Sequence, residues 1–369
     1  FYRTERLEAQ TGNDSMKFNY HGISQFSSIR NTASSSTLDR LGFKSEGTNL
    51  NLRYQNNTII ADSLFGIKYN LSNFDLNKYG FNHVTSEKTM GLYQNNNASQ
   101  LAILTDSIYK NIDFTVNTLD NQTSLLNALS GLNLTYFKRA PSQLFDQDAK
   151  SLNQRVAKNV SNSNKDFVTI TYRVIAPPHS QLYVSIPNIS WSDDNNHSLS
   201  ITVNGVTRNQ VTDNTFDFFD LGYFETESMV TIKLSFPGNK AISFDNPSFY
   251  ALDTKNYQIA MDTINDRDSK VTTSNNKVFV DYSSKTNASL FFTIPYDKGW
   301  TATINHKKVK IQRAQKGFMK VDVPSGKGKV VLTFIPYGLK TGSLISLLAS
   351  IIFCCYAYFI RKITVIQKR

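Results

Sequence analysis

The segment from Asn13 to Ser28, NDSMKFNYHGISQFSS, gathers polar side chains that could contact a substrate. The candidates are Asn13, Asp14, Tyr20, Ser27 and Ser28. Their amide, carboxylate and hydroxyl groups offer hydrogen-bond partners for sugar hydroxyls or phosphate oxygens. Asp14 could also assist as a base, although an Asn-Asp pair is more ordinarily a turn former. The segment therefore predicts a substrate contact, with a simple turn as the alternative.

Complete catalytic motifs are missing from the chain. The five histidines are scattered, and none has a histidine partner within a helical turn, so their spacing predicts no zinc site. The sequence contains neither a Gly-x-Ser-x-Gly elbow nor a phosphate-binding loop. It therefore identifies no catalytic residue and no metal ligand.

A second group of candidates surrounds one of the two tryptophans, in the stretch IPYDKGWTATINHKK that begins at Ile294. Trp300 either stacks on a sugar ring or packs into a core, and packing is favoured because the neighbouring sequence offers few polar partners. The nearby lysines provide positive charge for an anionic polymer or a lipid head group. They are Lys298, Lys307, Lys308 and Lys310. A solubilising lysine face is the alternative.

The charge of the chain is concentrated in this same region. Residues 296–337 contain nine basic and two acidic residues, a net charge of +7, whereas the whole chain carries +11. The uncharged run from Thr341 to Ile360 has the length of a transmembrane helix, and a buried core helix is the less favoured alternative. The basic residues after Ile360 predict a cytoplasmic tail at 361–369, with Phe1 to Tyr337 outside the cytoplasm. Since a domain outside the cytoplasm is a poor candidate for nucleic-acid binding, we do not expect nucleic acid as a partner.

The two ends and the cysteines suggest the setting of the chain. No initiator Met or signal-peptide pattern is present at the start, so we expect the chain to begin inside a larger or processed protein. The only cysteines, Cys354 and Cys355, lie within the predicted membrane helix. An exterior without disulfides fits a bacterial, Gram-positive origin better than a eukaryotic secretory route.

Strand patterning dominates, and the predicted fold is mainly β with an α+β N-terminal region. We expect an α+β domain over 1–160, a jelly-roll-like β-sandwich over 166–255 and a membrane-proximal β domain over 256–337, followed by the helix at 341–360. Residues 141–165 read as a linker. Asn57–Ser72 contains short β-prone runs, and Leu119–Asn133 predicts a helix that is capped by Asp120 and ends at Gly131.

Several stretches, taken in order, resemble the YfhO family of bacterial membrane proteins. They are RLEAQTGNDSMKFNYHGISQFSSIRN, LDRLGF, ADSLFGIKYNLS, GLYQNNNASQLAIL, NTLDNQTSLLNALSG and the final module that starts IPYDKGW. Asn305-His306 stands where an Asp-Gly turn is common in the family, a change that a hairpin tolerates. The similarity covers most of the chain.

The resemblance implies part of a multi-spanning glycosyltransferase of the GT-C class. Its expected donor is a polyprenyl-phosphate sugar, and its expected acceptor is a surface polymer such as lipoteichoic or wall teichoic acid. The resemblance implies a catalytic carboxylate outside this chain, no cofactor within it and a possible divalent cation in the full enzyme. It also makes Asn13–Ser28 the segment nearest the active site. The alternatives are a membrane-tethered carbohydrate-binding protein without enzymatic activity and a structural scaffold.

Overall fold

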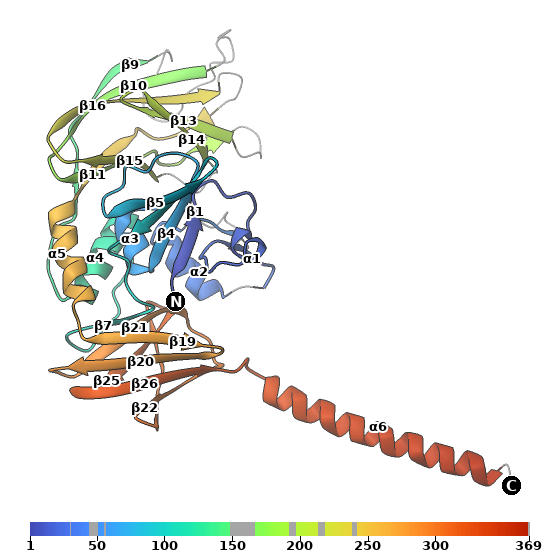
Figure 1. Cartoon of the computed structure of the whole chain (residues 1–369). Helices are drawn as coiled ribbons and strands as arrows, with labels where there is room; N and C mark the ends of the chain where they lie inside the picture. Colours follow the sequence, from blue (N-terminus) through green and yellow to red (C-terminus); the bar gives the residue numbers. More distant parts are fainter. Residues whose placement is uncertain are drawn as a thin grey trace.

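A computed structural model describes residues 1–29, 31–43, 51–54, 57–147, 167–191, 197–212, 218–237 and 242–367. They form an N-terminal α+β unit, a central β-sandwich and a membrane-proximal β-sandwich, and a long helix leaves the last of these (Figure 1). The predicted mainly β fold with an α+β N-terminal region is confirmed.

The N-terminal unit combines a four-stranded sheet and the two-stranded pair β2-β3 with several helices. Its sheet has the order β1-β4-β6-β5, formed by Arg3–Arg6, Ile67–Ser72, Met90–Asn95 and Phe81–Glu87, and β1 pairs with β4 in parallel. The remaining elements are α1 (Asp14–Lys17), β2 (Gln25–Phe26), α2 (Thr32–Asp39), β3 (Asn51–Leu52), α3 (Ile59–Leu64), α4 (Thr118–Ser130) and α5 (Thr254–Asn265).

Two helices in this unit test the sequence predictions directly. The β-prone run after Asn57 begins as the helix α3, because Thr58 accepts a hydrogen bond from the backbone N–H of Ala61, and it becomes a strand only at Ile67. The predicted helix α4 is confirmed, and Gly131 ends it with a left-handed φ of 79°. Its N-cap is Asn117 rather than Asp120, since the Asn117 side chain accepts from the first free N–H groups.

The central sandwich packs two sheets around one apolar core. One sheet contains β14 (Val206–Thr212), β13 (His197–Val203), β16 (Ser228–Pro237), β10 (Phe167–Ala176) and β9 (Ser142–Gln147), in that order. The other contains β15 (Phe218–Phe224), β11 (Ser180–Ser185), β18 (Ser248–Asp253) and β8 (Phe137–Arg139). A short pair, β12 (Ser190–Trp191) and β17 (Ile242–Ser243), accompanies them.

The membrane-proximal sandwich repeats this two-sheet arrangement around a core of its own. Its larger sheet has the order β19 (Ser269–Ser274), β20 (Lys277–Ser284), β26 (Gly326–Phe334), β22 (Trp300–Ile304) and β23 (Lys307–Val309). The smaller sheet contains β24 (Gln312–Ala314), β25 (Phe318–Val323), β21 (Ala288–Pro295) and β7 (Ala102–Leu104). The turns at Asn204-Gly205 and Asn305-His306 both have positive φ at their two central residues, as tight hairpins require.

The three units exchange elements, so the predicted boundaries at 160 and 256 need correction. Strands β8 and β9 precede residue 160 but belong to the central sandwich, and β9 occupies part of the predicted linker. Helix α5 follows that sandwich in sequence, yet its buried residues Tyr257, Ala260, Met261 and Ile264 join the N-terminal core. This spacing is that of one helical face, which explains the exchange.

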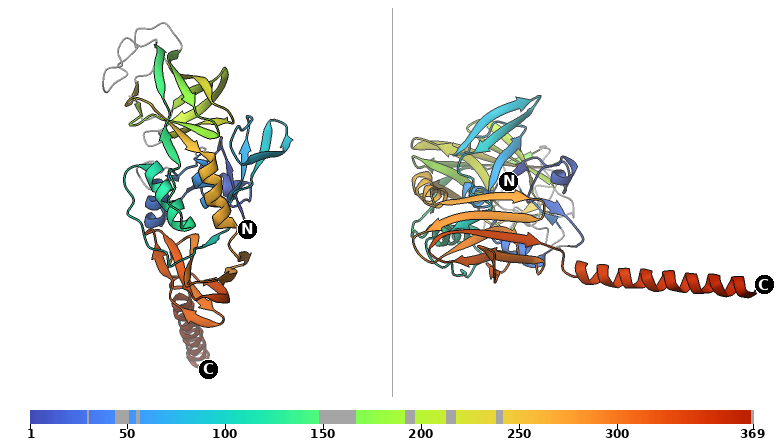
Figure 2. Two further views of the ribbon diagram at one scale, coloured as in Figure 1. Left: turned by 90° about the vertical axis from the view of Figure 1, so that its left-hand side faces the viewer. Right: turned by 60° about the horizontal axis from the view of Figure 1, so that its bottom comes forward.

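The last helix, α6 (Leu339–Gln367), stands apart from the body (Figure 2). Its segment Leu339–Arg361 is 23 residues long, apolar enough to cross a membrane and not buried by the rest of the chain. It contains the predicted span 341–360. The residues after Gln367 lie outside the described part of the chain.

Candidate functional site

The predicted N-terminal contact residues mostly serve the local fold. The side chain of Asn13 donates to the carbonyl of Phe26 at 3.0 Å and accepts from its N–H at 2.8 Å. This pair of hydrogen bonds joins the start of α1 to β2. Ser27 donates to the Ile29 carbonyl at 2.7 Å and stabilises the turn that follows. Ser28 is exposed, and Tyr20 is half-buried.

Asp14 is committed to the turn that precedes it. Its carboxylate is 3% exposed and accepts from the backbone N–H groups of Gln10 and Thr11 and from the Thr11 hydroxyl, each at 2.8 Å. Burial alone would raise the pKa of Asp14, but these hydrogen bonds outweigh it and leave the pKa below its ordinary value. A carboxylate held in this way is a poor general base, so the alternative of a turn former describes Asp14 better.

Two buried charges on β1 connect this loop to the rest of the molecule. Glu5 accepts from the N–H groups of Ile23 and Ser24 and from the Ser24 hydroxyl, and burial raises its pKa to about 7. Arg3 donates to the carbonyls of Phe65 and Thr293, the second at 2.7 Å. Strand β1 is thereby fixed both to its own loop and to β21 of the membrane-proximal sandwich.

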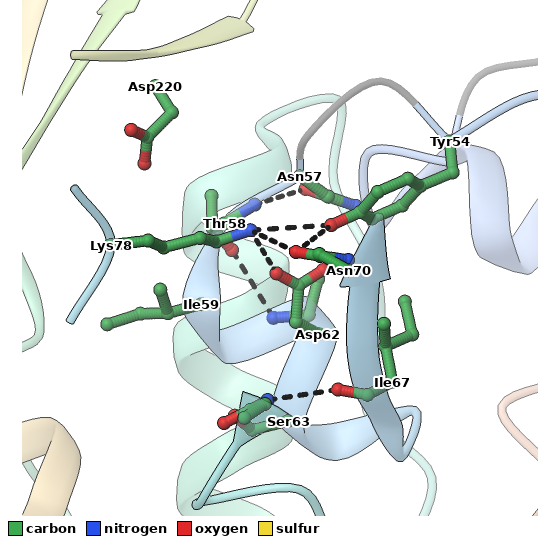
Figure 3. A network of polar contacts seen from close by, with 12 residues as sticks. Tyr54, Asn57, Thr58, Ile59, Asp62, Ser63, Ile67, Asn70, Lys78 and Asp220 are labelled. Atoms are coloured by element: carbon green, nitrogen blue, oxygen red, sulfur yellow. Dashed lines mark hydrogen bonds and ion pairs between the residues drawn. The ribbon is translucent and has the colours of Figure 1, made fainter. Parts of the chain in front are cut away.

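A sealed polar network lies at the junction with the central sandwich (Figure 3). Lys78 donates to Asp62 on α3, to the Tyr54 hydroxyl at 3.3 Å and to Asn70 on β4 at 3.5 Å. The side chains of Lys78 and Asp62 are 1% and 0% exposed. Burial raises the pKa of Asp62 to about 6, while the Lys78 ammonium opposes the rise.

Asp220 on β15 lies on the sandwich side of this network (Figure 3) and accepts from the Gln181 side chain at 2.7 Å. Burial raises its pKa as well, and Lys78 again opposes the rise. Because the network is closed to solvent, it holds units together rather than meeting a substrate. The motif ADSLFGIKYNLS contains Asp62, but nothing near it in the sequence points to Lys78 as its partner.

An open groove lies where the first residues of the chain meet the membrane-proximal sandwich. Its volume is about 530 Å³. Its described lining includes residues 273–278 of the β19–β20 turn and the rings of Trp300, Phe334, Phe1 and His21. The rings of Phe1 and His21 stack with centroids 4.6 Å apart. The groove thus combines aromatic faces with exposed polar groups from a distant hairpin.

Trp300 has both a packing contact and a position beside the groove. It is half-buried, and its ring packs on Phe334 with centroids 5.0 Å apart. It also lines the groove, where Asn275 and Lys277 supply polar groups that its own neighbourhood in the sequence lacks. The Asn276 side chain instead donates to the Phe334 carbonyl at 2.7 Å. An aromatic ring beside amide and ammonium donors suits a sugar or a phosphate-bearing glycan. No carboxylate is among the described lining residues, so this arrangement serves binding rather than acid-base chemistry.

A glycine fixes the position of the tryptophan. The N–H of Gly299 donates to the Asp297 carboxylate at 2.6 Å, and its carbonyl accepts from the N–H of Ile335 at 3.0 Å. A Cβ at Gly299 would lie 2.3 Å from the Ile335 carbonyl oxygen, so the backbone would have to shift.

We therefore expect Gly299→Ala to destabilise the membrane-proximal sandwich by about 1–3 kcal/mol, as overpacking typically does. Hydrogen exchange of β22 and β26 would measure this loss. Gly326→Ala is a useful contrast, because a Cβ there meets nothing within 4 Å, although its φ of 100° adds backbone strain. Unchanged exchange at β22 in the Gly299 variant would contradict the expectation.

The sequence of the chain matches a known protein family. The model of a family described as "Bacterial membrane protein YfhO" matches residues 1–346. The chain belongs to the YfhO family. Within it, the chain is 24% identical over 135 residues to the "Uncharacterized protein YfhO" of Bacillus subtilis (strain 168). The match covers 34% of this chain and 16% of that relative, so the chain spans only a small part of the relative's length.

Similarity to solved structures is weak. A ruminal GH26 endo-β-1,4-mannanase matches with 19% identity over 31% of this chain and 26% of its own, at a TM-score of 0.21. A Paenibacillus cycloisomaltooligosaccharide glucanotransferase complexed with cycloisomaltoheptaose matches with 8% identity over 57% of this chain and 50% of its own, at a TM-score of 0.22. Scores this low support no argument about the YfhO-family chain.

The predicted contact lysines of this YfhO-family protein come from two places, the turn before β22 and the β22–β23 hairpin. Lys298 lies beside the start of the membrane helix, with its Nζ 5.6 Å from the ring centre of Tyr337. Lys307 and Lys308 lie on the β22–β23 hairpin. The last residue of β22, Ile304, pairs with Val330 on β26. Since β26 runs from Val330 towards α6, the tip of this hairpin occupies the end of the sheet farther from the membrane helix.

Lys310 follows β23 and is exposed. Because β23 runs antiparallel to β22, Lys310 lies back towards the Trp300 end of the sheet, from which the chain enters α6. Lys298, beside Tyr337, and Lys310 are therefore nearer to α6 than Lys307 and Lys308. Within the described part of the chain, no group of three or more His, Cys, Asp or Glu side chains is arranged to hold a metal ion.

Proposed function

We propose that this chain is the extracytoplasmic part of a polytopic membrane glycosyltransferase, and that the groove beside Trp300 holds the polymer that accepts the sugar. The proposed donor is a polyprenyl-phosphate sugar, and the acceptor is a surface polymer such as lipoteichoic or wall teichoic acid. The bulk of the chain would then face the exterior, with the tail after α6 in the cytoplasm. The observation that carries the proposal is the half-buried Trp300 in a groove with amide and ammonium groups.

The position of the groove supports this assignment. Phe334, which lines it, is the last residue of β26, and the chain enters α6 five residues later. A lipid-linked donor is confined to the membrane surface, so an acceptor site must lie close to that surface. The exposed Lys277 adds a positive charge that suits the phosphates of a teichoic-type polymer.

Catalysis requires groups beyond this groove. Acceptor activation in such a transfer needs a carboxylate base, and the described lining of the groove contains none. We assign the catalytic carboxylate, and any divalent cation that the full enzyme uses, to the remainder of the longer protein. The proposed role of the present chain is to bind and orient the acceptor.

Binding at the groove can be tested with polyglycerol-phosphate oligomers. Trp191→Phe leaves Trp300 as the single tryptophan, so its emission reports on the groove. In the full chain in lipid nanodiscs, we expect a saturable change in this emission. In calorimetric titrations, Trp300→Ala should weaken binding by about tenfold or more, the usual cost of losing an aromatic stacking contact.

Trp191→Ala is the matched control, because Trp191 lies on β12, beside the central sandwich. This substitution should leave the affinity for the polymer unchanged. Equal affinity of the two alanine variants would place the polymer elsewhere and reject the groove as the acceptor site.

The absence of a carboxylate from the described lining also favours a second candidate, a tethered binding protein without transfer activity. Supplying the longer protein in vesicles with a radiolabelled polyprenyl-phosphate sugar and the polymer separates the two. Label transfer that depends on Trp300 supports the enzyme. Intact binding without any transfer supports the tethered binding protein.

A further inference from the structure

The loop between β1 and α2 exposes large apolar side chains in an unusual concentration. Met16 and Ile29 are 79% and 91% exposed, and Phe18 and Phe26 are 46% and 50% exposed. We call these four residues the apolar loop patch. Single exposed apolar residues are normal on protein surfaces, but several on one short segment indicate a contact surface.

The hydrogen bonds of this loop hold the patch outward. Asn13 joins the backbone at Phe26 to the start of α1, which carries Met16 and is followed directly by Phe18. Ser27 forms two hydrogen bonds with the backbone of Ile29, at 2.7 and 3.2 Å. The exposure of these side chains is therefore built into the loop by its own polar residues.

The patch also lies on the appropriate side of the molecule to meet a bilayer. In Figure 1 and in the right-hand view of Figure 2, α1 and its loop lie on the side of the body towards which α6 extends. Lys17 adjoins the patch, with its Nζ 5.0 Å from the ring centre of Phe18 and 3.1 Å from the Gln10 side chain. A cation beside apolar side chains matches an interface with anionic lipid head groups.

We propose that the apolar loop patch is a second membrane contact, at which Met16, Phe18, Phe26 and Ile29 enter the head-group boundary of the bilayer that α6 crosses. The patch and α6 then fix the body at two points, so that its tilt over the membrane is defined. This contact holds the N-terminal unit, including the start of β1, near the membrane surface. It does not depend on the proposed transfer function.

Lipid is favoured over a protein occupant because α6 already brings a bilayer to this side of the body. Each buried apolar side chain contributes a favourable transfer free energy, and Lys17 adds attraction to anionic lipid. The contact needs no additional partner.

The test places fluorophores at the patch in the full chain. In a Cys354→Ala/Cys355→Ala background, Met16→Cys and Ile29→Cys are labelled with bimane, and the chain is reconstituted in phosphatidylcholine–phosphatidylglycerol vesicles that contain nitroxide lipids. Met229→Cys is the matched control, because Met229 is 67% exposed on β16 of the central sandwich. We expect nitroxide quenching at positions 16 and 29 to exceed that at 229 several-fold.

Two outcomes would overturn the proposal. Quenching at 16 and 29 no greater than at 229 would mean that the loop stays in water. A blue-shifted emission at 16 and 29 without lipid quenching would mean that protein, such as a second copy of the chain, covers the patch instead. Since all three positions are exposed, the labels leave the apolar cores intact.

Discussion

Replacing Lys78 with methionine should destabilise the N-terminal unit by about 3–5 kcal/mol, the usual cost of removing one partner of a buried ion pair. The side chains of Lys78 and Asp62 are almost completely inaccessible, so water cannot solvate the carboxylate that remains. Asp220 on the neighbouring sandwich would lose the same compensating charge. Hydrogen exchange of the amides of α3 and β4 measures the local free energy of opening.

The loss should depend on pH in a defined direction. Without Lys78, the Asp62 carboxyl must hold a proton to stay buried, so Lys78→Met should cost less near pH 5 than near pH 8. The double variant Asp62→Leu/Lys78→Met removes both charges and should regain most of the loss.

A surface pair provides the control for this experiment. Lys329 and Asp281 are 3.5 Å apart and 52% and 57% exposed, so Lys329→Met should cost less than about 1 kcal/mol. If Lys78→Met were as mild as Lys329→Met, the buried network would not be what joins α3, β4 and the central sandwich.

The stability of the N-terminal unit should also fall as the pH rises, because of Glu5. Burial raises the pKa of Glu5 to about 7 from an ordinary value of 4.5. Between these values the folded chain keeps a proton that the unfolded chain has released, so protonation favours the folded state at the lower pH. This stability is present below about pH 4.5 and is lost as the pH rises through about 7. The shift corresponds to about 3 kcal/mol at most.

Glu5→Gln isolates this contribution from those of Asp62 and Asp220, whose pKa values are raised in the same direction. The amide oxygen of glutamine can still accept from Ile23 and Ser24, and its NH₂ group can donate to the Ser24 hydroxyl. We expect Glu5→Gln to flatten the pH dependence and to be more stable than the parent near pH 8. Hydrogen exchange of β1 and β4 across this pH range provides the measurement.

Glu87→Gln makes the same chemical change at an exposed side chain on β5 and controls for the substitution itself. A Glu5→Gln variant with the full pH dependence of the parent would refute the role of Glu5.

At the N-terminal loop, residue type alone does not distinguish a substrate contact from a structural role. Asn13 and Asp14 have the groups that sugars and phosphates bind, and those same groups satisfy the backbone N–H and carbonyl groups of their own loop. At Trp300 the neighbouring sequence leaves out the polar groups that line the same groove. Its polar neighbours come from the β19–β20 turn, more than twenty residues earlier in the chain.

Features that depend on local pattern could be predicted from the amino-acid sequence. The alternating strands, the helix that ends at Gly131, the hairpin at Asn204-Gly205 and the apolar membrane segment follow from side-chain period, turn chemistry and length. The ordered motifs identified the family, which the match over residues 1–346 confirms.

Which distant segments share a core or a surface became clear only from the three-dimensional packing. It brought α5 into the N-terminal core, β7 into the membrane-proximal sandwich and Lys78 beside Asp62. It also joined Trp300 to the β19–β20 turn in one groove and directed the apolar loop patch outward. Long-range packing buries whichever faces fit together, and a one-dimensional pattern does not contain that information.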